Sequence, residues 1–127
     1  MVVNCAQPFC PSSRTTGYGR RVLVVSRFRV PEPDAEGFRA DLDRAREALA
    51  ACPGFLAGTV GRNVDDPGLW VLTTTWENVG SYRRALSSYD VKLRAVAVLS
   101  RALDEPSAYE VVTEQTVLNT GSPRSLG

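Results

Sequence analysis

The hydrophobic pattern of the chain changes its period abruptly at Trp76. Before this residue, side chains alternate between two faces of a predicted strand over residues 69–76. One face of that strand is predicted to carry Trp70, Leu72, Thr74 and Trp76. Apolar residues then recur at helical spacing, at Val79, Tyr82 and Leu86. Asn78 precedes them as a predicted helix cap, so the pattern places the ring of Trp76 where a strand leads into a helix.

The composition is that of one ordinary globular domain, with 43% hydrophobic and 23% charged residues. A formal net charge of +1 does not favour a nucleic-acid partner. No apolar run approaches the roughly 20 residues that cross a bilayer, so we expect no membrane partner. Residues 1–19 lack both the charged segment and the apolar segment of a secretion signal. We therefore predict a cytoplasmic protein.

Metal binding is not expected from the potential ligands in the sequence. The chain has three cysteines, at positions 5, 10 and 52, and no histidine. Structural zinc sites use four nitrogen or sulfur ligands at recognisable spacing, and this set does not supply them. An odd number of cysteines also argues against a disulfide framework. Cys52 ends a helical apolar stripe and is expected to be a small buried residue.

Regular hydrophobic patterns extend from residue 20 to residue 112, and we predict one domain there. Residues 1–19 and 113–127 lack such patterns and are predicted to be flexible tails. Six elements are expected within the domain: a strand at 21–30, a helix at 35–52, strands at 55–62 and 69–76, a helical region from 79 to 103 that includes a second stretch at 90–103, and a strand at 107–112. The β-branched residues within 90–103 could break that stretch.

This order of elements predicts an α+β fold of the ferredoxin-like βαββαβ type. Its four-stranded antiparallel sheet would be covered by helices on one face only. The other face is expected to expose Leu23, Val25, Val60 and one side of the third strand. A chain of this length has no second helical layer to cover them. Two such sheets packed face to face would bury these residues, so we expect a homodimer that forms an α/β barrel.

Four segments of the sequence are similar to a known family: VVSRFRV, CPGFLAGTVGRN, LWVLTTTWENVGSYRRAL and DEPSAYEVV. Together they resemble the antibiotic biosynthesis monooxygenase domain, which belongs to the dimeric α+β barrel superfamily. The resemblance covers about residues 20–112. The family is functionally mixed, so the resemblance specifies the architecture more sharply than the activity.

One branch of this family binds and degrades haem, and its ligand pattern is not matched here. The position of its axial histidine falls on Ala95, and that of its distortion-promoting tryptophan falls on Ala85. Its strand-one asparagine falls on Ser26. Because the chain has no histidine, haem cannot be ligated through an imidazole. Haem degradation is therefore not expected, and ligation by a tyrosine or a cysteine is the one alternative left for haem binding. No other cofactor is expected.

A second branch oxidises polyphenol-like rings to quinones with O2 and without metal, flavin or haem. In its pattern a tryptophan, a tyrosine on the next helix and a later arginine line the pocket. Trp76, Tyr82 and Arg94 match these positions. An asparagine that precedes the tryptophan by four residues is replaced by Leu72. The resemblance therefore implies a cofactor-independent monooxygenase for an aromatic or polyphenolic small molecule, with one substrate-binding group missing.

The resemblance suggests a role for each of these residues. Arg94 would stabilise a phenolate, Tyr82 would donate or relay a proton, and Trp76 would form a wall of the cavity. Additional residues expected to bind the substrate are Trp70, Leu72, Arg27 and Ser26.

Structural roles fit several of the same residues. Trp76 and Tyr82 could pack in the core, and Arg94 could be a solvated or ion-paired side chain. Trp70 also suits a dimer interface, and Arg27 could be solvated. The turn-forming residues Asn63, Asp65 and Asp66 receive no catalytic role. The alternative function is a non-catalytic binding or assembly module of the same fold, because the sequence shows no evident general base.

Overall fold

A computed structural model describes residues 20–118 of the chain. The predicted tail 1–19, with Cys5 and Cys10, lies outside the described residues, as does the segment 119–127. The elements are, in order, β1 (Val22–Arg29), the short 3-10 helix η2 (Glu32–Asp34), α1 (Ala35–Ala50), β2 (Phe55–Arg62), β3 (Leu69–Trp76), α2 (Val79–Ser87), α3 (Tyr89–Arg94), α4 (Val96–Leu99) and β4 (Ala108–Glu110).

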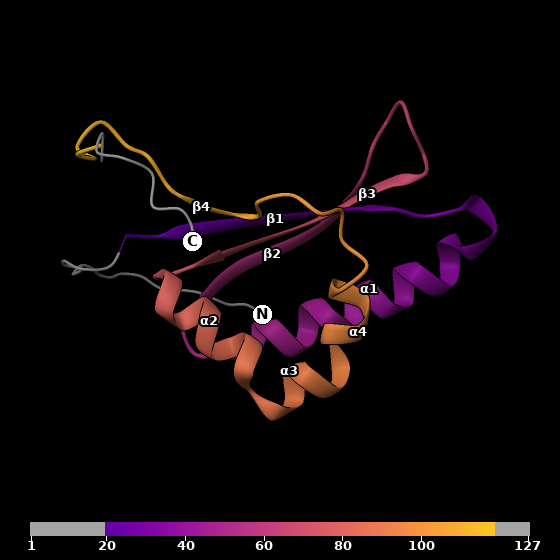
Figure 1. Cartoon of the computed structure of the whole chain (residues 1–127), viewed down its shortest axis with the longest axis horizontal. Coiled ribbons are helices and arrows are strands. Elements are labelled where there is room, and N and C mark those ends of the chain that lie inside the picture. Colours follow the sequence, from indigo (N-terminus) through magenta and orange to yellow (C-terminus); the bar gives the residue numbers. More distant parts are fainter. Residues whose placement is uncertain (1–19, 119–127) are drawn as a thin grey trace.

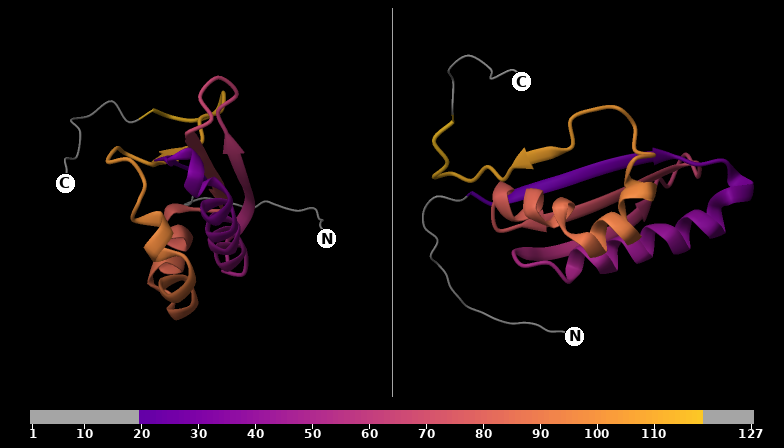
Figure 2. Two further views of the ribbon diagram at one scale, coloured as in Figure 1. Left: turned by 90° about the vertical axis from the view of Figure 1, so that its right-hand side faces the viewer. Right: turned by 60° about the horizontal axis from the view of Figure 1, so that its bottom comes forward.

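The strands form one antiparallel sheet in the order β2-β3-β1-β4. This confirms the predicted ferredoxin-like α+β fold. All four α-helices lie against the same side of the sheet, and the other side carries no described element (Figure 1). In Figure 2, α1 lies beside the shorter helices α2, α3 and α4 in one layer. One face of the sheet is therefore covered and the opposite face, called here the open face, is bare.

The core lies between the sheet and this helical layer. Alternate residues of β1 and β3 point into it because side chains alternate along a strand. The largest fully buried side chains are Trp76, Phe28, Phe38, Leu42, Leu49, Val30 and Val91. Cys52 is half-buried, and its thiol donates to the carbonyl oxygen of Ala48 at 3.5 Å. Its expected packing role is consistent with this position.

The start of α2 is built by the predicted cap. The Oδ1 atom of Asn78 accepts a hydrogen bond from the backbone N–H of Ser81 at 2.8 Å. The turn before β2 passes under the same helix end, because Gly54 has φ of +89° and a Cβ there would overlap the buried side chain of Ser81. A residue with a side chain would be strained in that conformation. Together these contacts seat α2 against the end of β3.

The second helical region is interrupted and shorter than predicted. The chain breaks between α3 and α4 at Ala95, within the apolar run expected to interrupt it. Helix ends at Leu99, whereas the predicted stretch extended to residue 103. The N–H of Leu103 instead donates to the carbonyl oxygen of Arg27 at 2.7 Å. Residues 103–107 therefore run along the edge of β1. Together with the turn at 100–102 that precedes them, we call them the edge segment.

Val60 was expected on the open face, and this prediction is wrong. Val60 pairs with Leu72 and packs against the core on the helix-covered side. The register of β2 shifts between Phe55 and Ala57, and such an irregularity reverses the face on which later residues lie. Leu23 and Val25 do lie on the open face, opposite Thr75 and Thr73 of β3 respectively.

The hairpin loop between β2 and β3 is held by a turn-forming residue. Oδ1 of Asn63 accepts from the N–H groups of Asp65 and Asp66, each at 2.8 Å, as expected for a turn-forming residue. Within residues 20–118, no helix is both long and apolar enough to span a membrane. The same residues contain no cluster of cysteine or acidic side chains that could hold a metal ion.

Candidate ligand-binding site

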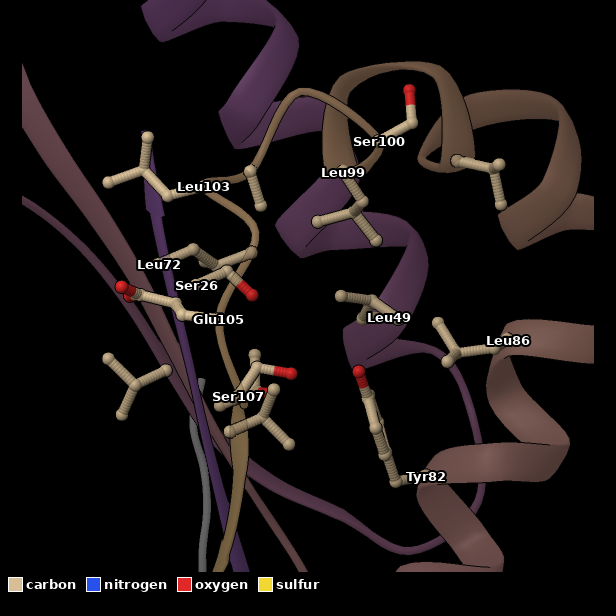
Figure 3. A pocket seen from close by; sticks show the side chains of 15 residues that line it. Ser26, Leu49, Leu72, Tyr82, Leu86, Leu99, Ser100, Leu103, Glu105 and Ser107 are labelled. Carbon is tan, nitrogen blue, oxygen red and sulfur yellow. The ribbon is translucent and has the colours of Figure 1, made fainter. Parts of the chain in front are cut away.

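A cavity of about 310 Å³ lies between the sheet and the helical layer. Its volume is at the lower end of the roughly 300–1,000 Å³ that is usual for small-molecule sites. Strands β1 and β3 form its floor, α1, α2 and α4 contribute further walls, and the edge segment closes one side (Figure 3). Most of the lining is aliphatic, including Leu49, Leu72, Leu86, Leu99 and Leu103. Such a lining suits an apolar ligand.

Three of the predicted site residues meet in this cavity. Ser26 and Leu72 are opposite each other on β1 and β3, and Tyr82 faces them from α2. Figure 3 shows the hydroxyl groups of Tyr82 and Ser26 directed into the space between the sheet and the helices. Residues separated by 56 positions in the sequence therefore converge on one space.

Trp76 lies behind the cavity and does not line it. Its side chain is fully buried between Phe55 and Tyr82, with ring centroids 5.2 and 5.7 Å away. Its indole Nε1 donates to the hydroxyl of Thr74 at 2.9 Å. Thr74 in turn lines the cavity. The strand-ending tryptophan thus supports two lining side chains, one through ring packing and one through a hydrogen bond.

Burial raises the pKa of Tyr82 above its ordinary value of 10.0, while the side chain of Ser107 acts in the opposite direction. Desolvation favours the neutral phenol because the phenolate loses its hydration. Tyr82 is therefore protonated at neutral pH. It can donate a hydrogen bond to a ligand oxygen, and it is a poor general base.

Sequence reasoning missed part of the lining. Thr74 and Ser107, both of which carry a hydroxyl group, line the cavity together with Ser26 and Tyr82. Thr74 carried a usable signal, because it is a polar residue within the apolar face of β3. No sequence pattern indicated Ser107, because only the course of the edge segment along β1 brings it to the cavity. Among the lining residues described, Glu105 is the sole charged group.

Arg27 lies outside the cavity, contrary to its expected role in substrate binding. It is on the open face, where its guanidinium forms two hydrogen bonds of 2.7 Å with the carboxylate of Glu105. The hydrogen bonds from Arg27 hold the pKa of Glu105 below its ordinary value of 4.5. This ion pair ties the edge segment to β1, beside the backbone hydrogen bond from Val25 to Ser107.

The Arg27–Glu105 pair predicts a pH-dependent contribution to stability. A carboxylate whose pKa is lowered on folding stabilises the fold above its unfolded pKa, and this contribution is lost as the pH falls through the folded value. We expect Arg27→Gln to return the pKa of Glu105 toward 4.5 and to lower Tm at pH 7, with the difference disappearing in acid. NMR titration of the Glu105 side chain and thermal melts would measure both effects.

Arg29→Gln is the matched control, because Arg29 pairs with Asp66 instead. An unchanged Glu105 titration in Arg27→Gln would contradict the assignment.

Arg94 also lies outside the cavity, although the resemblance placed it in the pocket. It is exposed at the end of α3, where its guanidinium lies 3.1 Å from Asp90 and 3.9 Å from Glu47. The solvated, ion-paired alternative therefore describes its position. Arg94 is therefore not among the described residues that line the cavity.

Trp70 is separated from the cavity along β3. Its ring packs edge-on against Phe38 at 5.6 Å, and the guanidinium of Arg62 lies 5.3 Å from its ring centroid. Trp70 borders a different groove, between α1 and β2. The two tryptophans share one strand face, as predicted, but they serve different parts of the molecule.

The fold and the cavity together define a ferredoxin-like α+β domain with a small, mostly apolar cavity. Residues 21–93, more than half of the chain, match the antibiotic biosynthesis monooxygenase family. The chain belongs to this family, as its resemblance indicated.

Individual relatives support this assignment at different levels. SnoaB from Streptomyces nogalater, described as a cofactor-independent oxygenase, has 26% sequence identity and a TM-score of 0.64, covering 76% of this chain and 97% of its own. A conserved protein from Methanosarcina mazei Go1 has 19% identity and a TM-score of 0.61, covering 72% of this chain and 92% of its own, and shows the shared fold alone. A 42.8 kDa protein in the whiE locus of Streptomyces coelicolor is 28% identical over 98 residues. That match covers 76% of this chain but 24% of the relative.

Proposed function

We propose that the protein is a cofactor-independent monooxygenase that oxidises an electron-rich aromatic small molecule with O2. The observation that carries the proposal is the largely apolar cavity with the hydroxyl of Tyr82 directed into it. The likeness to SnoaB, which extends over nearly all of that oxygenase, supports the same reaction class. Quinone formation is part of the proposal.

The reaction balances without a further reductant. A ring CH2 group of an anthrone, or of the keto form of a phenol, loses a proton to solvent, and the resulting anion transfers one electron to O2. The two radicals combine to a peroxide anion. This anion takes up a proton, and the hydroperoxide so formed loses water and leaves a carbonyl group. One substrate and one O2 thus give one quinone and one water. The protein must exclude bulk water and stabilise the oxygen that bears the developing negative charge.

The proposed roles follow from these requirements. Tyr82 donates a hydrogen bond to the developing oxyanion, since its phenol stays neutral. Ser26 and Leu72 contact the substrate from the floor of the cavity. Trp76 holds the Tyr82 ring in place. Glu105 is a weak base because Arg27 lowers its pKa, so we assign no general base to it.

Oxygen uptake by the purified protein, without added metal or flavin, tests the proposal. The substrates would be hydroquinones, naphthols and anthrones, with heat-denatured protein as the control. We expect enzyme-dependent uptake with at least one substrate, at one O2 per quinone formed. A flat trace across the panel would overturn the oxygenase proposal for these substrate classes.

A non-catalytic binding module is the second candidate function. It is favoured by the position of Arg94, whose charge is engaged by Asp90 and Glu47 at the surface, away from the cavity. A binding module would show ligand-dependent thermal stabilisation without oxygen uptake. Uptake with matching quinone formation would exclude it.

We further propose that two copies pair through their open faces. The face carries apolar and small polar residues from three strands: Leu23, Val25, Leu69, Val71, Thr73, Thr75 and Tyr109. The arginines on it, Arg27 and Arg29, are each paired with a carboxylate of the same chain. Burial of such a face would provide a favourable hydrophobic contribution to association.

Val71→Glu should disrupt this dimer. Val71 lies mid-sheet, between Arg27 of β1 and Gly61 of β2. Because Glu105 already engages the Arg27 guanidinium, the symmetric interface would bury two further carboxylates without a free cation beside them. We expect the dimer dissociation constant to rise at least about 100-fold, since an unpaired buried charge costs roughly 3–5 kcal/mol. Sedimentation equilibrium measures the change. Ala40→Glu, on the exposed side of α1, is the control and should leave the dimer intact. A dimer of wild-type strength in Val71→Glu would exclude this interface.

A further inference from the structure

Thr74 is a buried polar residue in the otherwise apolar face of β3. It is 2% exposed and lines the cavity between its neighbours on that face, Leu72 and Trp76. A hydroxyl group has one proton to donate as well as lone pairs that accept. Buried polar groups are usually hydrogen-bonded, so a hydroxyl proton without an acceptor at a cavity wall calls for a partner.

Trp76 determines how this hydroxyl can be used. The indole N–H is a donor only, and it is directed at the Thr74 oxygen from a fully buried ring at 2.9 Å. One lone pair of the hydroxyl oxygen is therefore engaged. Within residues 20–118, this is the one hydrogen bond that the Thr74 side chain makes. The proton of Thr74 remains available to an acceptor in the cavity.

The charge of the lining limits the ligand that would supply this acceptor. No cationic side chain from the described residues lines the cavity, and the carboxylate of its one charged residue, Glu105, is paired with Arg27. The lining therefore offers an anion no partner of opposite charge. Most of the lining is apolar, which suits an aromatic or aliphatic ring. An uncharged ring bearing a carbonyl oxygen fits these conditions, since the carbonyl accepts a hydrogen bond and carries no charge.

We propose that Thr74 selects an uncharged aromatic ketone by donating a hydrogen bond to its carbonyl oxygen, and that Trp76 is the positioning residue that orients this donor. The inference rests on the proposed use of the cavity as the substrate site. It gives the strand-ending tryptophan a role beyond packing, because the indole fixes the polarity of a hydroxyl that touches the ligand. A donor oriented in advance loses less entropy on binding than a free rotor.

Binding of 1-tetralone and tetralin to the full chain tests the proposal. The two probes have the same ring system and differ in whether one position is a carbonyl or a CH2 group. Calorimetric titration under nitrogen separates binding from any reaction with O2. We define the ketone preference as the Kd of tetralin divided by the Kd of 1-tetralone. We expect this preference to be about threefold to tenfold larger in the wild type than in a protein that lacks the hydrogen bond. Thr74→Val should remove this increment, and Thr74→Ser should retain it.

Thr74→Val leaves the buried indole N–H without its acceptor and could therefore fail to fold. A second pair of variants tests the proposal without this defect. Trp76→Phe and the double variant Thr74→Val/Trp76→Phe have the same ring and differ in the hydroxyl. We expect Trp76→Phe to reduce the ketone preference, because the hydroxyl can rotate, and the double variant to lose it. A ketone preference that is unchanged by removal of the hydroxyl in either background would overturn the proposal.

The oxygenase proposal and this inference can fail separately. A hydroxyl-dependent ketone preference with no oxygen uptake would support the role of Thr74 and overturn the oxygenase. Oxygen uptake without a hydroxyl-dependent preference would support the oxygenase and overturn the role of Thr74. Trp76 would then be a packing residue alone.

Discussion

Tyr82→Phe is expected to lower the rate of oxygen uptake about 100-fold, mostly through kcat. The substitution retains the ring that packs against Trp76 and removes the hydroxyl that is directed into the cavity. Loss of a donor that stabilises a developing oxyanion typically costs roughly 100–1,000-fold in kcat. The substrate itself should still bind, because most of the lining is aliphatic and unchanged.

The neutral state of the Tyr82 phenol supports this expectation, because only the protonated phenol can donate a hydrogen bond. Burial raises its pKa above 10.0, so the phenol keeps its proton through the neutral range and the donor is present there. Steady-state oxygen uptake with the best substrate of the panel would measure the effect. Tyr89→Phe is the matched control, because it makes the same chemical change at a side chain that is exposed on α3. A Tyr82→Phe rate within twofold of wild type would remove Tyr82 from the proposed mechanism.

Trp76→Ala is expected to destabilise the fold by about 3–5 kcal/mol. Trp76 is fully buried, and its loss would leave a void bounded by Phe55 and Tyr82 at the junction of β2, β3 and α2. The variant would also leave the Thr74 hydroxyl without its indole donor. Each kcal/mol corresponds to roughly 4–8 °C in Tm for a domain of this size. Chemical denaturation and thermal melts would measure the loss.

The two tryptophans provide a matched comparison for the hydrogen bond. Trp76→Phe and Trp70→Phe make the same change of ring at buried positions of one strand face. The indole N–H of Trp70 has no hydrogen-bond partner among the described residues, whereas that of Trp76 donates to Thr74. We expect Trp76→Phe to cost roughly 0.5–1.5 kcal/mol more than Trp70→Phe. An equal or smaller cost would show that the indole–Thr74 bond contributes nothing net to stability.

Elements with a strong local pattern were predicted accurately. The bounds predicted for β2 and β3 coincide with those in the structure, and the Asn78 cap begins α2 as expected. Alternation of side chains and capping depend on residues that are adjacent in the chain, so the sequence is sufficient to reveal them. The strand order then follows from the order of elements, because the βαββαβ arrangement has few compact solutions.

Elements shaped by contacts distant in sequence were predicted less well. The helical stretch predicted to residue 103 ends at Leu99, because the edge segment uses its backbone to bond with β1. Val60 lies on the helix-covered face, because the irregularity in β2 changes its alternation. In the first case a backbone contact with β1 ends the helix early, and in the second the pairing of β2 with β3 changes the face on which Val60 lies.

The same division holds for the candidate site. Local periodicity determined that Leu72, Thr74 and Trp76 share a strand face and that Tyr82 follows on the next helix. Only the tertiary structure decided that Thr74, Tyr82 and Ser107 meet around one cavity while Arg94 pairs with carboxylates outside it. The physical reason is that periodicity specifies the direction of a side chain relative to its own element. Which side chains meet depends on how loops and sheet register bring distant elements together.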